Sequence, residues 1–272
     1  MGTESWPPKL PDVSMDSVQL ESNPFAFSPN AELYKVKGCS LVYKMKGYHR
    51  EYNMMKAAGD CAVKAHGRVF MQIPIGQVKV GMMGFLMALE TPLDPKMLLP
   101  SQDSIPTPDP ISPSQRNAVM EKMIYVVQLL HDRGIIHGDI KMANMLICSD
   151  GMVRLCDFAE ARFIGEDPSD YEGKETANYL SPRRCQDWRE ADFELPEVED
   201  DDYALGLAIW ELYTGRIPFD GWYGDDIWDY VAEGKTVDVN EVEDVSVRPI
   251  ILQFLRRGGD KVANSRWIKF AW

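Results

Sequence analysis

Residues 91–113 are rich in proline, serine and aspartate, and they separate two stretches of the chain with different hydrophobic patterns. Before them, apolar and β-branched side chains nearly alternate with polar ones, which is typical of strands. After them, apolar residues recur at the spacing of an α-helix. A chain of 272 residues suits one large domain or two small lobes. The sequence therefore predicts an α+β fold with an irregular arm at 1–30, a small β-sheet region with one helix at 31–90, a connector at 91–113 and a mainly helical region at 114–272.

Two short strands in the first half are predicted to form a hairpin. They lie at residues 31–37 and 39–45 and meet at Gly38. A short helix rich in methionine and alanine is expected at 48–58 and ends at Gly59. Further strands are expected at residues 17–20, 69–75 and 78–90.

The second half carries clear start and stop signals for helices. Ser112 to Gln115 have the pattern of a capping box with Pro113 at the first helical position, and Gly134 ends the helix that follows. A second hairpin is predicted around a turn at 149–151. Its strands are expected at 145–148 and 153–156, and later helices at 205–213, 226–233 and 247–256. The acidic run at 197–202 is predicted to be a solvated turn.

Charge and cysteine content argue against several classes of protein. The net charge is −13, whereas a general nucleic-acid binder needs a basic surface. Neither an apolar run long enough to span a membrane nor a secretory signal is visible. The five cysteines are an odd number without a CxxC pair, so neither a zinc site nor a disulfide framework is predicted. We therefore expect an intracellular protein, cytoplasmic or nuclear, that binds neither nucleic acid nor a membrane.

Four polar residues in two neighbouring loops have the chemistry that phosphoryl transfer needs. Residues 137–144 (HGDIKMAN) come between the long helix and the second hairpin, and Asp157 follows that hairpin. Asn144 and Asp157 can supply the oxygen ligands that Mg²⁺ prefers. Asp139 can accept or orient the proton of an acceptor hydroxyl, and Lys141 can neutralise charge on the phosphoryl group. Each residue taken singly is more often an ordinary loop or core residue, and their order and spacing together favour function.

This set of residues resembles the catalytic and metal-binding loops of the eukaryotic protein kinase superfamily. Residues 176–182 (TANYLSP) are similar to the segment that holds a peptide substrate, and Asp201 is similar to a buried carboxylate that bonds the catalytic loop. The resemblance implies a bilobal fold, with 31–90 as the N-lobe, 91–113 as hinge and connector, and 114–272 as the C-lobe. It also implies a protein Ser/Thr kinase that depends on ATP and on Mg²⁺ or Mn²⁺, with a protein substrate as its partner.

The same resemblance implies which residues bind the nucleotide. Lys44 ends a predicted strand and is similar to the strand lysine of the family, with Lys46 as the alternative cation. Glu51 in the following helix is the expected ion-pair partner of Lys44. The adenine is expected to contact the backbone of Leu89, Glu90 and Thr91. Its apolar walls are expected from Leu86, Met87, Leu89, Leu146 and Cys156.

Two departures from the family pattern affect the expected activity. A GxGxxG motif is missing before Lys44, where residues 22–29 (SNPFAFSP) stand instead, so the backbone cradle for phosphates is missing or rebuilt. Gly138 replaces the arginine that usually precedes the catalytic aspartate and pairs with a phosphate on the activation loop. We therefore expect a constitutive active site without a phosphate switch.

Two further departures affect the expected structure. Ala159 replaces the usual glycine after Asp157 and Phe158, and it should restrain flipping of that loop because alanine tolerates positive φ poorly. Arg183 stands where a glutamate normally pairs with an arginine near the C-terminus. An acid such as Glu241 or Glu243 is the expected partner in this reversed arrangement.

Two other functions fit parts of the sequence. A small-molecule kinase of the related fold is favoured by the short Lys44–Glu51 spacing, but Lys141 and the TxxYxxP segment count against it. A pseudokinase or scaffold with weak nucleotide binding is favoured by the missing glycine-rich loop, but the four polar residues of the two loops count against it. The protein Ser/Thr kinase is the preferred interpretation.

Overall fold

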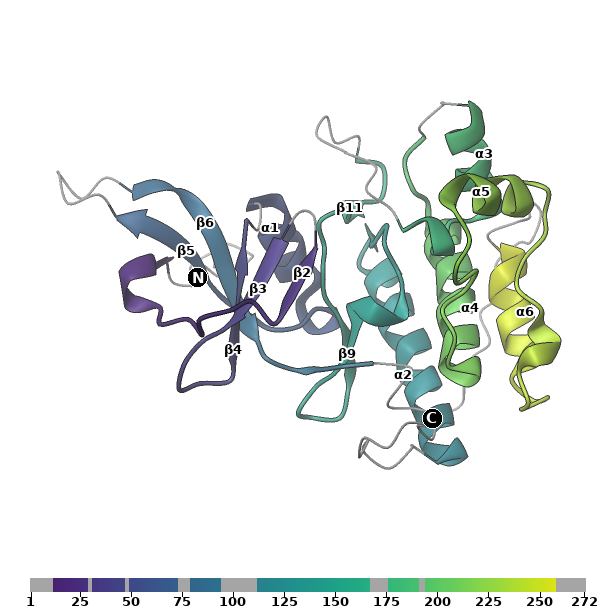
Figure 1. The fold of residues 1–272 in the computed structure, drawn as a ribbon, viewed down its shortest axis with the longest axis horizontal. Coiled ribbons are helices and arrows are strands. Elements are labelled where there is room, and N and C mark those ends of the chain that lie inside the picture. The colour runs from purple at the N-terminus through teal and green to yellow at the C-terminus, as the bar shows by residue number, and fades with distance from the viewer. Residues whose placement is uncertain are drawn as a thin grey trace, which may run out of the picture. The chain divides into compact units, whose positions relative to one another are not determined.

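The computed structural model describes residues 12–28, 31–46, 49–72, 79–93, 112–166, 176–190 and 194–257. The strands are β1 (Asp12–Ser14), β2 (Ala26–Ser28), β3 (Ala31–Lys35), β4 (Leu41–Met45), β5 (Ala65–Gln72), β6 (Lys79–Ala88), β7 (Thr91–Pro92), β8 (Ile135–Ile136), β9 (Met145–Ile147), β10 (Val153–Leu155) and β11 (Arg162–Phe163). The α-helices are α1 (His49–Ala58), α2 (Pro113–Asp132), α3 (Pro182–Glu190), α4 (Val198–Thr214), α5 (Gly224–Ala232) and α6 (Arg248–Arg257). Short 3-10 helices are η1 (Met15–Ser17), η2 (Gly59–Cys61), η4 (Met142–Asn144), η5 (Ala177–Tyr179) and η6 (Val239–Glu241). The predicted α+β class is confirmed, with a β-sheet-rich N-terminal region and a mainly helical later region (Figure 1).

The chain divides into two compact units. The first comprises residues 1–94, 117–139 and 143–172, and the second comprises 95–116, 140–142 and 173–272. Most of the predicted connector, residues 94–111, lies outside the described residues, as do residues 73–78 at the expected ends of two strands.

The main sheet of the first unit has the strand order β1-β5-β6-β4-β3-β2 (Figure 1). β3 and β4 form the predicted hairpin, and β4 also pairs with β6, with Lys44 opposite Phe85. Tyr43 stands opposite Leu86 in the same ladder. Because successive side chains point to opposite faces of a strand, Lys44 and Phe85 share one face and Tyr43 and Leu86 the other. The helix α1 packs on the Lys44 face, where the rings of Tyr52 and Phe85 lie 5.8 Å apart.

The N-terminal arm packs on the opposite face of this sheet. Partly buried apolar side chains of the arm pack against the buried cluster of that face; they are Val13, Met15, Val18 and Leu20. The strand predicted at 17–20 is wrong, because β1 lies at Asp12–Ser14 and pairs in parallel with β5. Leu20 makes only an isolated bridge with Val36. The apolar residues of the arm therefore reflect burial against the sheet rather than a strand at that position.

Local signals placed α2 and the second hairpin correctly. The amide of Ser112 donates to Gln115 Oε1 (2.7 Å) and the amide of Gln115 donates to Ser112 Oγ (3.3 Å), so the predicted capping box is confirmed. Gly134 has a φ of 72° after the helix ends. β9 and β10 form the predicted hairpin. The short strand β7, which pairs with β9, was not predicted.

Helices make up most of the second unit, and α4 is its most buried element. α4 begins at Val198, well before the predicted residue 205. The prediction of a solvated turn at 197–202 is wrong, because Asp200 and Asp202 are only 8% and 4% exposed. The burial that was expected for Asp201 is confirmed, since this residue is 2% exposed. α5 and α6 are confirmed close to their predicted positions, and α3 was not predicted. In the part of the chain that the structure describes, every helix is too short or too polar to cross a bilayer.

Candidate functional site

A buried lysine holds two carboxylates in the first unit. Lys44 Nζ on β4 lies 2.6 Å from Glu51 Oε1 on α1 and 2.7 Å from Asp157 Oδ1, which follows β10. The side chains of Lys44 and Glu51 are 9% and 2% exposed, whereas that of Asp157 is 39% exposed. The short Lys44–Glu51 spacing therefore permits the ion pair. Solvent reaches this cluster from the Asp157 side.

The charges of this cluster are unequal. Burial by itself lowers the pKa of Lys44, but the attraction of Glu51 and Asp157 raises it above its ordinary value, so the ammonium is charged. Burial raises the pKa of Glu51, Lys44 opposes that rise, and the Asp157 carboxylate adds to it. One ammonium thus faces two carboxylates. A cation would be attracted to the exposed carboxylate of Asp157 in this cluster.

The catalytic-loop candidates Asp139 and Asn144 are joined by hydrogen bonds. Asn144 Nδ2 donates to the Asp139 carbonyl (2.8 Å) and to Asp139 Oδ2 (2.9 Å). These bonds use the amide nitrogen of Asn144, and its side-chain oxygen Oδ1 is the atom type that Mg²⁺ prefers. The Asn144 carbonyl also accepts from the amide of Cys156, the residue before Asp157. The loop that carries Asp139 and Asn144 is therefore tied to the segment that carries Asp157.

A buried histidine strengthens the same connection. His137 is fully buried, its Nε2 lies 3.1 Å from the Cys156 carbonyl, and its ring meets that of Phe158 edge-on at 4.8 Å. Asp157, which lies between Cys156 and Phe158 in the chain, has a φ of 62°. This conformation costs free energy in a residue other than glycine. The packing of His137 and Phe158 therefore holds a strained residue in place. Ala159 is not among the described residues with positive φ, so the unusual backbone angle falls on Asp157 itself.

Gly138 is required by the local backbone. Its φ is 78°, and a Cβ at this position would lie 2.9 Å from the Glu160 carbonyl oxygen. An arginine would be strained here for both reasons. The replacement of the usual arginine by Gly138 therefore agrees with the observed path of the loop.

Lys141 and the predicted peptide-holding segment belong to the second unit. Lys141 Nζ donates to Thr176 Oγ1 (2.7 Å). Thr176 precedes η5, where Asn178 Nδ2 donates to the Pro218 carbonyl (2.6 Å) and the Tyr179 hydroxyl donates to Glu211. The segment is thereby anchored through the side chains of Thr176, Asn178 and Tyr179.

The predicted adenine-binding segment is partly committed to other contacts. The amide of Leu89 donates to the Ser40 carbonyl (3.0 Å), and Glu90 Oε2 accepts from the amide of Ser149 (3.0 Å). Thr91 pairs with Ile147 in the β7–β9 ladder. The Leu89 amide is therefore already used within the protein.

The predicted apolar walls of the adenine site divide between the two faces of the sheet. Met87 lies opposite Val42 on the Lys44 face, and Leu146 is a buried residue of β9. Leu86 belongs to the cluster under the N-terminal arm. The prediction that Leu86 lines the adenine site is wrong, because a one-residue step along a strand reverses the side-chain direction.

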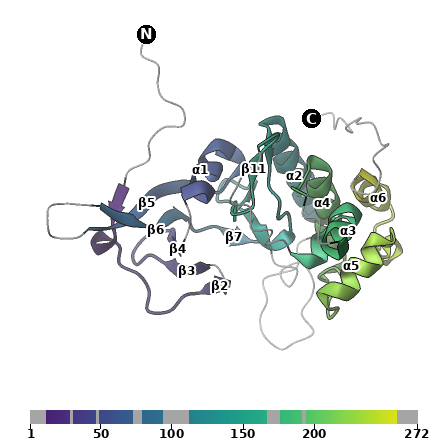
Figure 2. The same cartoon turned by 90° about the horizontal axis from the view of Figure 1, so that it is seen from above.

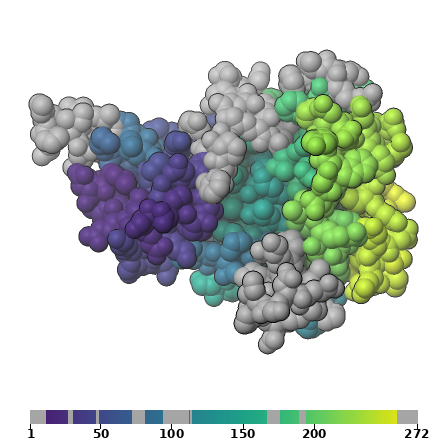
Figure 3. Space-filling view, viewed as in Figure 1, coloured from purple at the N-terminus to yellow at the C-terminus, as the bar shows by residue number. Residues whose placement is uncertain are grey.

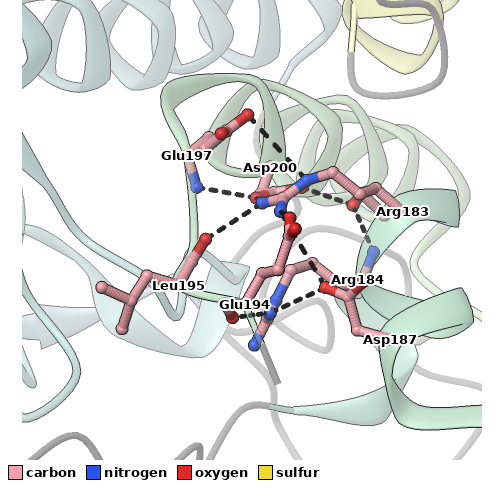
Figure 4. Close-up of polar contacts among 8 residues, drawn as sticks. Arg183, Arg184, Asp187, Glu194, Leu195, Glu197 and Asp200 are labelled. Atoms are coloured by element: carbon pink, nitrogen blue, oxygen red, sulfur yellow. Dashed lines mark hydrogen bonds and ion pairs between the residues drawn. The ribbon is translucent and has the colours of Figure 1, made fainter. Parts of the chain in front are cut away.

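Arg183 has partners different from those predicted (Figure 4). Its guanidinium pairs with Asp200 and lies 2.8 Å from Glu194 Oε2, and it donates to the Leu195 carbonyl (3.1 Å). Glu241 instead pairs with Arg216 (2.6 Å). The prediction of Glu241 or Glu243 as partner is therefore wrong.

The role of Asp200 was missed in the sequence, although a signal for it is present. Glu197 and Asp200 form a capping box in which the Glu197 amide donates to Asp200 Oδ2 (2.7 Å). Two acids three residues apart before an apolar run are compatible with such a helix start. The same carboxylate also accepts from Ser181 Oγ (2.5 Å). Asp201, predicted to support the catalytic loop, is buried within α4.

The residues present fit a magnesium nucleotide better than a resident metal ion. Among the described residues, no group of three or more His, Cys, Asp or Glu side chains could hold a metal. Mg²⁺ commonly uses one or two protein groups together with nucleotide phosphates. Asn144 and Asp157 provide the oxygen atoms for that arrangement, and the surplus negative charge around Lys44 favours a cation.

Comparisons with known proteins agree with this chemistry. The family model described as protein kinase domain matches residues 96–257. A probable serine/threonine-protein kinase of Corynebacterium efficiens is 36% identical over 124 residues, which cover 44% of this chain and 18% of that protein. The serine/threonine-protein kinase PrkC of Bacillus subtilis is 32% identical over 114 residues, covering 41% and 17%. The serine/threonine-protein kinase PknB of Mycobacterium leprae is 31% identical over 123 residues, covering 44% and 19%. The matched part thus spans less than a fifth of the length of these relatives.

Proposed function

The chain belongs to the protein kinase domain family, and from this premise we propose that it transfers the terminal phosphoryl group of ATP to serine or threonine hydroxyls of a protein substrate. The observation that carries the proposal is the cluster of Lys44, Glu51 and Asp157. Lys44 and Glu51 lie outside the residues that the family model matches, and Lys44 contacts Asp157, which lies inside them, so the cluster adds support beyond the matched segment.

Each site residue has a role in this proposal. Lys44 binds the nucleotide phosphates, and Glu51 orients Lys44. Bound Mg²⁺ or Mn²⁺ neutralises charge on the phosphate oxygens. Asn144 and Asp157 would hold that ion through their side-chain oxygens. Asp139 accepts a hydrogen bond from the substrate hydroxyl and orients it for attack.

Two further features define the proposed substrate and regulation. Lys141, whose ammonium donates to Thr176, stabilises the transferring phosphoryl group beside the peptide-holding segment. Gly138 has no side chain that could bind an activation-loop phosphate, which supports activity without a phosphate switch.

Radiolabelled ATP with Mg²⁺ or Mn²⁺ tests the proposal, with general protein substrates and a panel of metabolites as acceptors. Label should enter protein, and Asp139→Asn should lower the rate by roughly 10²–10⁴. Asp132→Asn is the matched control, because Asp132 is an exposed aspartate near the end of α2. Label found only in metabolites would instead identify a small-molecule kinase.

A pseudokinase with weak nucleotide binding is the second candidate. β2 and β3 pair through Ser28 and Ala31, so only residues 29 and 30 connect them. The sequence of this stretch lacks the GxGxxG motif whose backbone amides would cradle phosphates. Absence of any labelled product, together with an unchanged melting temperature in ATP and Mg²⁺, would support this candidate and overturn the first.

A further inference from the structure

An open groove lies along one face of α5 in the second unit, and none of its lining residues has been given a role above. Its volume is about 570 Å³. Its main lining residues are Trp222, Tyr223, Asp226, Asp229, Tyr230 and Glu233. The chain around residues 220–235 appears in yellow-green at the surface in Figure 3. The groove therefore combines aromatic rings with carboxylates in one exposed place.

The aromatic rings are held firmly but remain accessible. Trp222 and Tyr230 lie 5.2 Å apart at 67°, and Phe219 contacts both rings at 6.0 and 6.1 Å. Trp222 is 47% exposed and Tyr223 is 82% exposed. Large exposed aromatic side chains of this kind are enriched at the energetic centres of protein interfaces.

The carboxylates line one side of the same groove. Asp226, Asp229 and Glu233 are spaced by three and four residues along the chain, so they share a face around α5. Asp225 is exposed on the same helix but does not line the groove. The groove is therefore negative as well as aromatic, the combination that attracts arginine and lysine side chains.

One cation of the chain already uses this chemistry. Lys235 Nζ lies 5.2 Å above the ring of Tyr230 and 2.5 Å from Glu233 Oε2. Lys235 lines the groove together with the rings of Trp222 and Tyr223 and the carboxylates of Asp226 and Asp229. A second cation can repeat these contacts there.

The groove is connected to the predicted peptide-holding segment within the second unit. Asn178 of η5 donates to the carbonyl of Pro218, the residue before Phe219. η5 also packs against α5, and α3 lies beside α5 (Figure 2). The rings of Trp188 on α3 and Trp228 on α5 stack with their centroids 5.1 Å apart. A protein bound in the groove would thus lie on the same framework as the segment proposed to hold the phosphorylated peptide.

We propose that this groove docks an arginine- or lysine-containing segment of the protein substrate, separate from the residue that is phosphorylated. The inference rests on the proposed kinase function for the identity of the occupant as substrate. Charge complementarity selects a basic segment, and the exposed rings select side chains that stack, above all arginine. The site takes a peptide because its open shape suits an extended chain.

Fluorescence anisotropy with the full chain tests the docking without any catalysis. The probe is a fluorescein-labelled peptide of alternating arginine and glycine, and its counterpart with glutamate in place of arginine is the control peptide. Asp226→Lys with Asp229→Lys should weaken binding of the arginine peptide by about tenfold or more. Asp225→Lys with Glu243→Lys changes the net charge equally at exposed positions outside the groove, and should change binding by less than about twofold.

A third variant separates the aromatic contribution. Trp222→Ala should weaken binding of the arginine peptide by about three- to fivefold, because one exposed cation–π contact is lost. Equal weakening by the two double variants would overturn the inference, since it would reflect net charge alone. Equal binding of the glutamate peptide would also overturn it.

A kinetic measurement links the groove to the proposed function. The arginine–glycine segment is appended to a peptide that the chain phosphorylates. The longer peptide should have a lower KM and an unchanged kcat, and the Asp226/Asp229 variant should remove that difference in KM. The Asp139→Asn chain should still bind the probe peptide. Binding without phosphoryl transfer in every chain would refute the kinase proposal and leave a basic-peptide site, whereas transfer without groove-dependent binding would refute the docking site alone.

Discussion

The contact between Arg183 and Asp200 is expected to stabilise the start of α4 and the segment that precedes α3. Asp200→Ala removes a carboxylate that is 9% exposed and that accepts from Arg183, from Ser181 Oγ (2.5 Å) and from the Glu197 amide (2.7 Å). Removing one partner of a buried ion pair typically costs about 3–5 kcal/mol. Arg183 keeps Glu194 at 2.8 Å and the Leu195 carbonyl at 3.1 Å, so the lower end of about 3 kcal/mol applies.

Thermal unfolding followed by circular dichroism measures this loss. At roughly 2–4 °C per kcal/mol for a chain of this size, the melting temperature should fall by about 6–12 °C. Glu194→Gln is the matched control, because that side chain also bonds Arg183 but is 61% exposed. It should cost less than about 1 kcal/mol.

Exchanging the two charges tests independently whether the ion pair accounts for the lost stability. Arg183→Asp combined with Asp200→Arg should recover part of the stability that each single change loses, because the ion pair is restored in reverse. Equal melting temperatures for Asp200→Ala and Glu194→Gln would refute the reasoning. Strictly additive losses in the charge exchange would do so as well.

Three further predictions concern the first unit. Gly138→Ala should lower the free energy of unfolding by at least about 1 kcal/mol, because the residue has a positive φ and a Cβ would clash with the Glu160 carbonyl. Thermal unfolding measures this loss, and an unchanged melting temperature would contradict the observed loop path. Hydrogen bonds from Arg154 lower the pKa of Asp150 from 3.8 to about 2, so the carboxylate contributes stability above pH 3.8 that is lost as the pH falls through about 2. An NMR titration should give that midpoint, and Arg154→Gln should return it towards 3.8. Iodoacetamide should modify the exposed Cys39 before any of the buried cysteines. Mass spectrometry of the peptides measures the order of modification, and the reverse order would contradict this prediction.

Sequence patterns with a local cause were predicted correctly. The Ser112–Gln115 capping box and the β9–β10 hairpin depend on neighbours in the chain, and both are present. α3 has no comparable local signal, because its arginines also bond groups beyond the helix, as Arg183 does with Glu194 and Asp200. Arg184, for example, is fully buried and bonds the Glu194 carbonyl. Elements stabilised by such distant contacts were the ones missed.

The candidate site divides in the same way. The roles of Asp139, Asn144 and Asp157 stay predictions from their order in the chain, whereas the predicted ion pair of Lys44 with Glu51 is present in the structure. The sharing of Lys44 between two carboxylates could not be predicted, because Asp157 lies 113 residues further along the chain. The positive φ of Asp157 could not be predicted either, because a glycine would have indicated such an angle and the chain has an aspartate at that position.

The missing phosphate loop and the crowded lysine together suggest how the site would bind a nucleotide. The sequence has no GxGxxG motif before Lys44, and Pro24 and Pro29 in the corresponding stretch lack a backbone N–H that could meet a phosphate oxygen. The charge of the phosphates then falls mainly on Lys44 and on a cation held beside Asp157. Because Lys44 already faces Glu51 and Asp157, phosphates would compete with a carboxylate for the same ammonium. A cation that binds Asp157 releases Lys44 from this competition, so nucleotide affinity in this chain should depend more steeply on the divalent metal than it does in a kinase whose glycine-rich loop supplies backbone donors.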